Sequence, residues 1–249
     1  MKAVYTGAVA LMALALASCG DKTGSNDAAA NATAAPLEQI AAPNGGDWTQ
    51  VVEATPEGGF RMGNPNAQVK LVEYGSLTCP HCADFSEKGV PVLESTYVKS
   101  GQVSYEMRNY VRDPIDLAAS LLSRCGGAAP YFKLTDQLFA AQREWLDKFS
   151  GLDQAAQQRL SAMQPSEQTG ELARIGGLID FMKVRGVPEA KAKACLADKA
   201  AMDKLVSMAN VANTQYQLPG TPTFLINGNV VPDTASWDAL EPALREALK

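Results

Sequence analysis

The sequence predicts an α/β protein in which a mixed β-sheet is interrupted by a helical insertion. Residues 69–74 and 102–110 have the composition of strands and flank a short helix, the order of a parallel crossover unit. Residues 114–217 then carry apolar side chains at helical spacing over roughly a hundred positions. Residues 223–226 return to a strand, which a hairpin turn joins to Val230-Val231.

The first 18 residues have the pattern of a secretion signal. Lys2 precedes an apolar run over residues 3–17, which is too short and too rich in small residues for a membrane-spanning helix. The tetrad Leu16-Ala17-Ser18-Cys19 resembles the lipobox of bacterial lipoproteins, in which the cysteine is lipidated and becomes the first mature residue. We therefore expect a lipoprotein signal peptide over 1–18 and a lipid anchor on Cys19. An ordinary signal peptide, cut near Ala17, is the alternative.

Such an anchor implies a protein of the periplasm or cell envelope, attached to a membrane. Residues 19–47 contain the proposed lipidated cysteine and few large apolar side chains, so we expect a flexible tether there. The folded domain is expected over residues 48–249. The chain has 22 Lys and Arg against 27 Asp and Glu, a net charge of −5, which argues against a nucleic-acid partner.

The strands and helices follow from local patterns. A short strand over 60–62 ends at the turn signal Gly63-Asn64-Pro65. Residues 69–74 alternate and are rich in β-forming side chains. A helix begins at the first cysteine of Cys79-Pro80-His81-Cys82 and carries Phe85, Val90 and Leu93 on its apolar face.

The last elements are predicted in the same way. Asn227-Gly228-Asn229 is a strong hairpin signal between residues 223–226 and Val230-Val231. Residues 236–248 form an amphipathic helix that Ser236 is suited to cap.

The pair Cys79 and Cys82 carries the chemistry. Two residues separate the cysteines, so they can close a small disulfide ring, and Cys79 stands at a helix N-terminus, where backbone N–H groups stabilise a thiolate. Pro80 suits the first helical turn, and a cationic His81 would add a second positive partner. A passive disulfide clip and half of a zinc site are the alternatives. A zinc site would lack ligands, because the sequence has no second CxxC and His81 is its only histidine. We expect no metal and no cofactor.

The strand, the CPHC helix, the helical insertion and the return through Gly220-Thr221-Pro222-Thr223 together resemble the DsbA family of bacterial thiol oxidoreductases. The resemblance covers roughly residue 60 to the C-terminus and implies a thioredoxin-like fold. It implies that Pro222 is cis and lies against the cysteine pair, and that Thr221 pairs with an extended substrate segment. A trans proline that ends a loop is the alternative. The resemblance also implies a membrane quinone-linked redox partner.

Glu73 is a candidate proton carrier. Members of the resembled family carry a buried acid at a similar place beneath the active site. Alternation puts Val69, Leu71 and Glu73 on one face of the strand, which favours burial and a raised pKa. Such an acid would exchange a proton with Cys82. An exposed strand glutamate is the alternative.

Cys125 and Cys195 both fall in the helical insertion and have no catalytic neighbour in sequence. In an oxidising compartment we expect them to form a structural disulfide between two helices. A second redox-active pair is the alternative.

These features predict a disulfide oxidase or isomerase that acts on unfolded or cysteine-containing exported proteins. A thiol reductase of the envelope is the second enzymatic hypothesis. A lipoprotein that binds peptides without catalysis, on the same scaffold, is a third.

Overall fold

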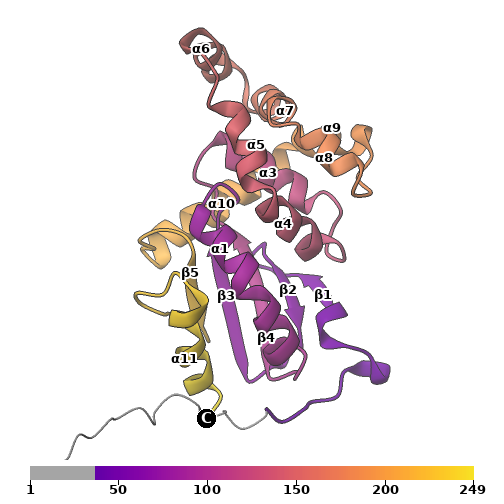
Figure 1. Cartoon of the computed structure of the whole chain (residues 1–249), viewed down its shortest axis with the longest axis vertical. Helices are drawn as coiled ribbons and strands as arrows, with labels where there is room; N and C mark the ends of the chain where they lie inside the picture. Colours follow the sequence, from indigo (N-terminus) through magenta and orange to yellow (C-terminus); the bar gives the residue numbers. More distant parts are fainter. Residues whose placement is uncertain (1–36) are drawn as a thin grey trace, which may run out of the picture. The chain divides into compact units, whose positions relative to one another are not determined.

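The computed structural model describes residues 37–249. The predicted signal peptide, Cys19 and residues 19–36 of the predicted tether lie outside this range. The sheet of the described part has the strand order β1-β2-β4-β3-β5-β6, and only β3 and β4 run parallel to one another (Figure 1). The strands are β1 (Val52–Ala54), β2 (Phe60–Gly63), β3 (Val69–Gly75), β4 (Val103–Asn109), β5 (Thr223–Ile226) and β6 (Asn229–Val230).

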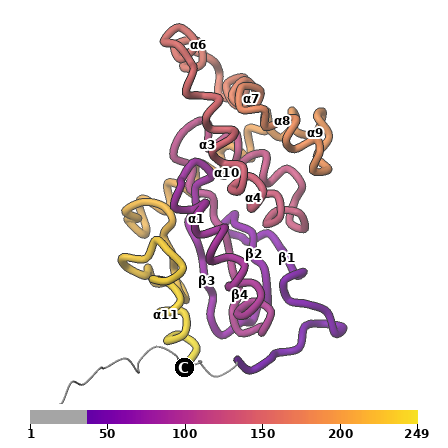
Figure 2. Tube along the Cα trace, viewed as in Figure 1, coloured from indigo at the N-terminus to yellow at the C-terminus, as the bar shows by residue number. Residues whose placement is uncertain are grey.

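The predicted crossover unit and helical insertion are both present, which confirms the fold class. The chain leaves β3, forms the helical segment α1–η3, and returns as β4 beside β3 in parallel register, with Leu71 opposite Tyr105. No strand interrupts the described chain between β4 and β5, and Figure 2 traces the insertion as a separate group of helices. The helices are α1 (Pro80–Lys88), α2 (Val90–Val92), the π-helical η3 (Leu93–Val98), α3 (Pro114–Arg124), α4 (Tyr131–Ala140), α5 (Gln142–Leu146), α6 (Gln154–Ala162), α7 (Pro165–Ile175), α8 (Leu178–Lys183), α9 (Glu189–Leu196), α10 (Lys199–Gln215) and α11 (Trp237–Ala247), with short 3₁₀ turns η1 (Pro43–Gly45), η2 (Trp48–Gln50) and η4 (Asp147–Phe149).

Helices cover both faces of the central strand β3. On one face, Phe85 of α1 packs between Phe224 of β5 and Trp237 of α11, with ring centroids 4.6 Å and 6.4 Å away. On the other face, Val72 and Tyr74 pack against Ala212 of α10. Burial on both sides explains why β3 alternates only in part, since Val72 and Tyr74 on one face are buried like Val69 and Leu71 on the other.

The sequence predicts a flexible tether up to residue 47, but residues 37–47 are bound to the folded domain. Ile40 donates its backbone N–H to the carbonyl of Ser100 at 2.8 Å, and Trp48 donates its indole N–H to the carbonyl of Ile40 at 2.8 Å. Leu37 and Ala42 pack against the core. The segment is held by contacts with residues far away in sequence, so its own polar composition gives no sign of them.

Strand β1 is the other element that the local pattern does not predict. It is three residues long and mostly exposed, and it pairs with β2 through Val52 opposite Met62. A short edge strand carries no apolar alternation, because neither of its faces is fully covered.

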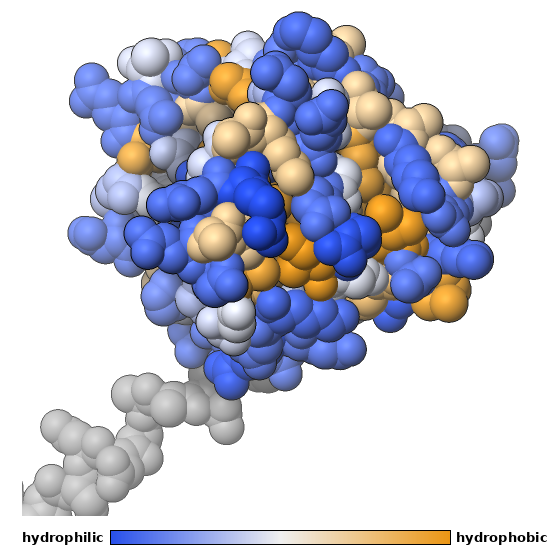
Figure 3. Space-filling view, turned by 90° about the horizontal axis from the view of Figure 1, so that it is seen from above, coloured by the Kyte–Doolittle hydropathy of each residue, from blue (hydrophilic) through white to orange (hydrophobic). Residues whose placement is uncertain are grey.

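The surface of the insertion is mainly hydrophilic. Figure 3 looks onto this end of the molecule and shows apolar surface in hollows between hydrophilic side chains. Among the described residues, no helix combines the length and the apolar character that crossing a membrane requires.

Candidate active site

The cysteine pair lies at the N-terminus of α1, directly after β3. Cys79 is the N-cap residue with an extended backbone, and Pro80 occupies the first helical turn, where its missing N–H group costs no hydrogen bond. The Cys79 N–H donates to the carbonyl of Ser76 at 3.1 Å, so a tight turn connects the strand to the helix. The turn places Cys79 at the positive end of the helix dipole.

Both sulfur atoms are free thiols and both residues are buried, Cys79 being 3% and Cys82 0% exposed. The Cys79 thiol donates to the backbone carbonyl of Thr221 at 3.1 Å. The Cys82 sulfur accepts the backbone N–H of Ser76 at 3.5 Å. The Thr221–Pro222 peptide bond is cis, and the structure therefore brings together the two segments that the sequence marks as the site.

The two thiols have opposite pKa shifts. A hydrogen bond from the Cys82 thiol, opposed by burial and helped by the Thr221 side chain and the backbone N–H groups of Cys82 and His81, lowers the pKa of Cys79 to about 5. Burial, together with Cys79 and the charge of Glu73, raises the pKa of Cys82 well above its usual value. Near neutral pH this arrangement gives a Cys79 thiolate beside a Cys82 thiol.

His81 and Pro80 are exposed at the start of the helix. The backbone N–H of His81 is one of the groups that lower the pKa of Cys79. His81 therefore contributes a backbone donor to the site, while the residue itself is exposed.

Glu73 lies on β3 and is 1% exposed. It accepts a hydrogen bond from the hydroxyl of Tyr105, and its second oxygen has no hydrogen-bond partner among the described residues. Burial, assisted by the charges of Asp136 and Cys79, raises its pKa to about 8 despite the Tyr105 hydrogen bond. Glu73 is thus a buried acid that holds a proton at neutral pH and interacts electrostatically with both cysteines.

A cavity of about 760 Å³ lies beside α1, where Pro80, Glu94 and Asp136 contribute to its lining. Burial raises the pKa of Asp136 to about 6, and burial together with Asp136 raises that of Glu94 to about 7. The charge of Asp136 also raises the pKa of Glu73, so Asp136 interacts electrostatically with the active site.

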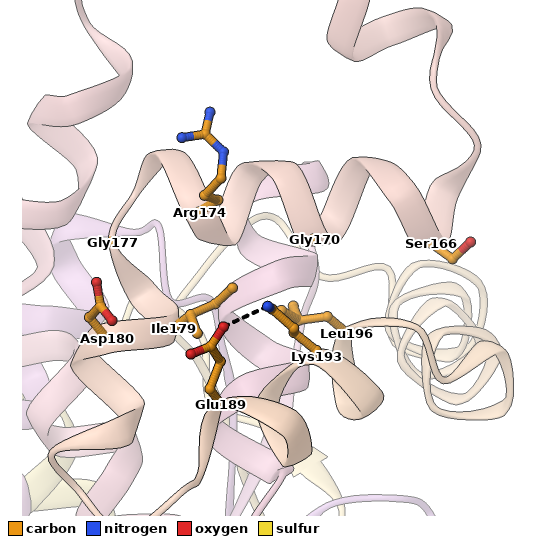
Figure 4. Close-up of a pocket in the computed structure, with 9 residues that line it drawn as sticks. All are labelled: Ser166, Gly170, Arg174, Gly177, Ile179, Asp180, Glu189, Lys193 and Leu196. Carbon is orange, nitrogen blue, oxygen red and sulfur yellow. Dashed lines mark hydrogen bonds and ion pairs between the residues drawn. The ribbon is translucent and has the colours of Figure 1, made fainter.

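A second cavity, of about 470 Å³, lies between α7, α8 and α9 (Figure 4). Its charged side chains are exposed, and one ion pair, between Lys193 and Glu189 at 2.5 Å, lies along α9. It contains no residue of the cysteine site.

Cys125 and Cys195 form a disulfide, with an S–S distance of 1.94 Å and a Cα–Cα distance of 5.8 Å. Cys125 caps the C-terminus of α3 and Cys195 lies in α9, so the bond ties two helices of the insertion together. Residues 37–249 contain no group of three or more His, Cys, Asp or Glu side chains suited to a metal ion.

Two buried polar residues of the insertion, Asp116 and Gln142, contact the turn before Cys79, and sequence patterns do not single them out. Asp116 interrupts the apolar positions of α3 and is 0% exposed, which is a weak signal in a helix that is otherwise amphipathic. Gln142 begins α5 and carries no such signal.

Comparisons with known proteins agree with this geometry. The family model described as "Thioredoxin" matches residues 55–246. A candidate protein-disulfide oxidoreductase of Rickettsia bellii is 29% identical over 188 residues, which is 76% of this chain and 64% of that protein. A second such protein, from Rickettsia felis, is also 29% identical, over 59% of its own length. The chain thus covers less than two thirds of these curated relatives.

Solved structures are similar over more of their length. The crystal structure of a protein-disulfide isomerase from Novosphingobium aromaticivorans has 32% sequence identity and a TM-score of 0.73, covering 76% of this chain and 96% of that one. Alpha-DsbA1 of Wolbachia pipientis shares the fold at 21% identity, with a TM-score of 0.62, over 79% of this chain and 93% of that one. With a matching family model over most of its length, the chain belongs to the thioredoxin family and has the DsbA form of its fold.

Proposed function

We propose that this protein is a thiol–disulfide oxidoreductase of the cell envelope that exchanges disulfides with cysteine-containing exported proteins. One observation carries the proposal: two buried thiols, placed together at a helix start, have pKa values shifted in opposite directions. A passive disulfide clip has no need of this asymmetry, whereas exchange chemistry requires one thiolate and one protonated partner.

In the oxidising direction, a substrate thiolate attacks the Cys79 sulfur of the Cys79–Cys82 disulfide. The enzyme's S–S bond breaks, and Cys82 leaves as a thiolate that takes a proton from Glu73, whose pKa of about 8 keeps it protonated at neutral pH. A second substrate thiolate then attacks the substrate sulfur of the mixed disulfide. Cys79 leaves as a thiolate, and the substrate disulfide is complete. The substrate loses two electrons and the enzyme disulfide becomes a dithiol.

The lowered pKa of Cys79 favours oxidation of substrates over their reduction. It stabilises the reduced enzyme and makes Cys79 a good leaving group, both of which increase the oxidising power of the disulfide. The named isomerase among the similar structures supports isomerisation as a further use of the same thiols. Equilibration with glutathione measures the reduction potential of the Cys79–Cys82 pair and so tests whether the protein oxidises or reduces its substrates. A potential near about −120 mV indicates an oxidase and one near about −270 mV a reductase.

The Thr221–Pro222 turn is the proposed substrate platform. The Thr221 carbonyl already lies 3.1 Å from the Cys79 sulfur, so a peptide segment bound there would place its cysteine beside the reactive atom. Reoxidation of the enzyme by a membrane quinone-linked partner would complete the cycle.

Anchoring through Cys19, after removal of residues 1–18, is part of the proposal. The Cys125–Cys195 disulfide supports an oxidising compartment. Expression with labelled palmitate tests the anchor: the label should enter the wild-type protein and be absent from Cys19→Ser, which should also leave the membrane fraction.

The main experiment uses Cys79→Ser and Cys82→Ser variants in insulin reduction and peptide oxidation. Both should lose turnover, and Cys79→Ser should form no mixed disulfide with a substrate peptide. Unchanged turnover in Cys79→Ser would refute the catalytic role. Peptide affinity retained in the double serine variant, with no turnover in the wild type, would instead indicate a binding protein.

A further inference from the structure

The turn Ser76–Cys79, which leads from β3 into α1, is buried along its whole length. Ser76 and Leu77 are 0% exposed, and Thr78 is 9% exposed. The turn lies outside the strand pairing of the sheet, so its backbone N–H and C=O groups need other partners away from water. The helical insertion supplies several of these partners.

Asp116 of α3 satisfies donors of the turn. Its carboxylate accepts the backbone N–H of Leu77 at 2.9 Å and the hydroxyl of Ser76 at 2.6 Å. It also accepts the backbone N–H of Arg112 at 3.1 Å, and it is 0% exposed. A carboxylate that faces this many donors fixes the position of each of them.

Gln142 of α5 satisfies acceptors of the same turn. Its side-chain amide donates to the carbonyl of Leu77 at 2.8 Å and to the carbonyl of Cys79 at 2.9 Å. Gln142 is 4% exposed. The N–H and the C=O of Leu77 are therefore both bound by the insertion, the first through Asp116 and the second through Gln142.

The position of this turn determines the position of the sulfur atoms. The N–H of Ser76 is donated to the Cys82 sulfur at 3.5 Å, and the carbonyl of Ser76 accepts the N–H of Cys79 at 3.1 Å. A displaced turn would move Cys79 away from the Thr221 segment and from the N–H groups of α1 that stabilise its thiolate.

We propose that Asp116 and Gln142 are positioning residues of the redox site, which hold the Ser76–Cys79 turn so that both sulfurs keep their donors. The inference rests on the proposed function and adds to it that the helical insertion, and not only the thioredoxin core, sets the reactivity of Cys79. Neither residue touches a reacting atom.

The test is the rate of Cys79 alkylation against pH in Asp116→Asn and Gln142→Met. The asparagine keeps one acceptor oxygen and places an NH₂ donor against N–H groups that cannot reverse their polarity. Gln142→Met keeps the side-chain volume, leaves the Leu77 carbonyl without its donor and leaves the Cys79 carbonyl with the N–H of Ala83 alone. Each variant should raise the alkylation midpoint by about one pH unit, which corresponds to an approximately tenfold smaller thiolate fraction below the midpoint.

Asp180→Asn and Gln137→Met are the matched controls. Both residues lie in the insertion, and neither side chain makes a hydrogen bond within residues 37–249. Their alkylation profiles should equal that of the wild type.

The outcomes separate the two proposals. A wild-type midpoint near that of free cysteine would end the proposed function itself. A low wild-type midpoint that persists in folded Asp116→Asn and Gln142→Met would overturn only the positioning role, even if both variants melt at lower temperature. Gln142→Met decides alone if Asp116→Asn does not fold.

Discussion

The sulfur of Cys79 lies 3.1 Å from the backbone carbonyl oxygen of Thr221, a residue that follows it by 142 positions in the chain. The contact joins the start of α1 to the loop before β5, and the whole insertion separates these segments in sequence. Since β5 pairs with β3, Tyr74 lies opposite Thr223, and the sheet register brings the cis-proline loop to the end of β3 that leads to the cysteines.

The Thr221 hydroxyl is buried and makes no hydrogen bond among the described residues, so it is free to donate to a thiolate on Cys79. We expect it to contribute to the reactivity of Cys79, because the Thr221 side chain is among the groups that lower its pKa. Thr221→Val keeps the branched shape and removes the hydroxyl. The pKa of Cys79 should rise from about 5 by up to about one unit. Alkylation against pH measures the change, and equilibration with glutathione should show a weaker oxidant. Thr214→Val, on the exposed face of α10, is the control. An unaltered midpoint in Thr221→Val would contradict this role of the hydroxyl.

The buried carboxyl of Glu73 should make stability depend on pH. Its pKa is raised from 4.5 to about 8, so between these values the folded protein holds a proton that the unfolded chain has released. The free energy of unfolding should therefore fall as pH rises through this window, by roughly 3–5 kcal/mol in the wild type relative to Glu73→Gln. Urea denaturation at a series of pH values measures this change. The oxidised protein is used, because Cys79 is then in a disulfide and does not titrate. If the free energy of unfolding depended on pH in the same way in the wild type and in Glu73→Gln, the carboxyl would not be buried as described.

The Cys125–Cys195 disulfide should stabilise the protein by restricting the unfolded chain. The two cysteines are separated by 70 positions, for which the loop-entropy model gives about 4 kcal/mol. A Cys125→Ser/Cys195→Ser variant should unfold at a lower urea concentration, while Cys79 should keep its alkylation profile below the transition. Loss of turnover in a folded double variant would favour a second redox-active pair instead.

The aromatic contact between Phe224 of β5 and Phe85 of α1 should contribute strongly to the stability of the fold around the active site. Phe224 is 0% exposed, follows the cis-proline by two positions and packs on α1. Phe224→Ala should cost about 3–5 kcal/mol of the free energy of unfolding. Val184→Ala, at a side chain 80% exposed, should change stability by less than about 0.5 kcal/mol. Equal effects of the two substitutions would contradict the packing described for β5.

Local patterns predict most of the fold because they coincide with buried elements. The strand at residues 69–74, the helix after Cys79 and the hairpin at Asn227-Gly228 each have a pattern that the tertiary structure does not override. The long helical stretch is equally visible, since its apolar positions recur at helical spacing in nearly every helix.

The features that sequence does not predict depend on distant contacts. Strand β1 exists because β2 offers it an edge, and residues 37–47 are fixed by Ser100 and Trp48. Asp116 and Gln142 are ordinary polar residues in their own helices. The Ser76–Cys79 turn, which is distant in sequence, provides both hydrogen-bond partners of the Gln142 side chain and two of those of Asp116.

The N-terminal end of the described chain has a consequence for how the protein would face its surroundings. Ile40 bonds to Ser100, just beyond η3, and the whole helical segment Pro80–Val98 lies between there and Cys79. The C-terminus also lies at this end (Figure 1). If residues before Leu37 attach the protein to a surface, this end of the domain faces that surface, and the start of α1 with Cys79 lies farther from it, on the side of the helical insertion.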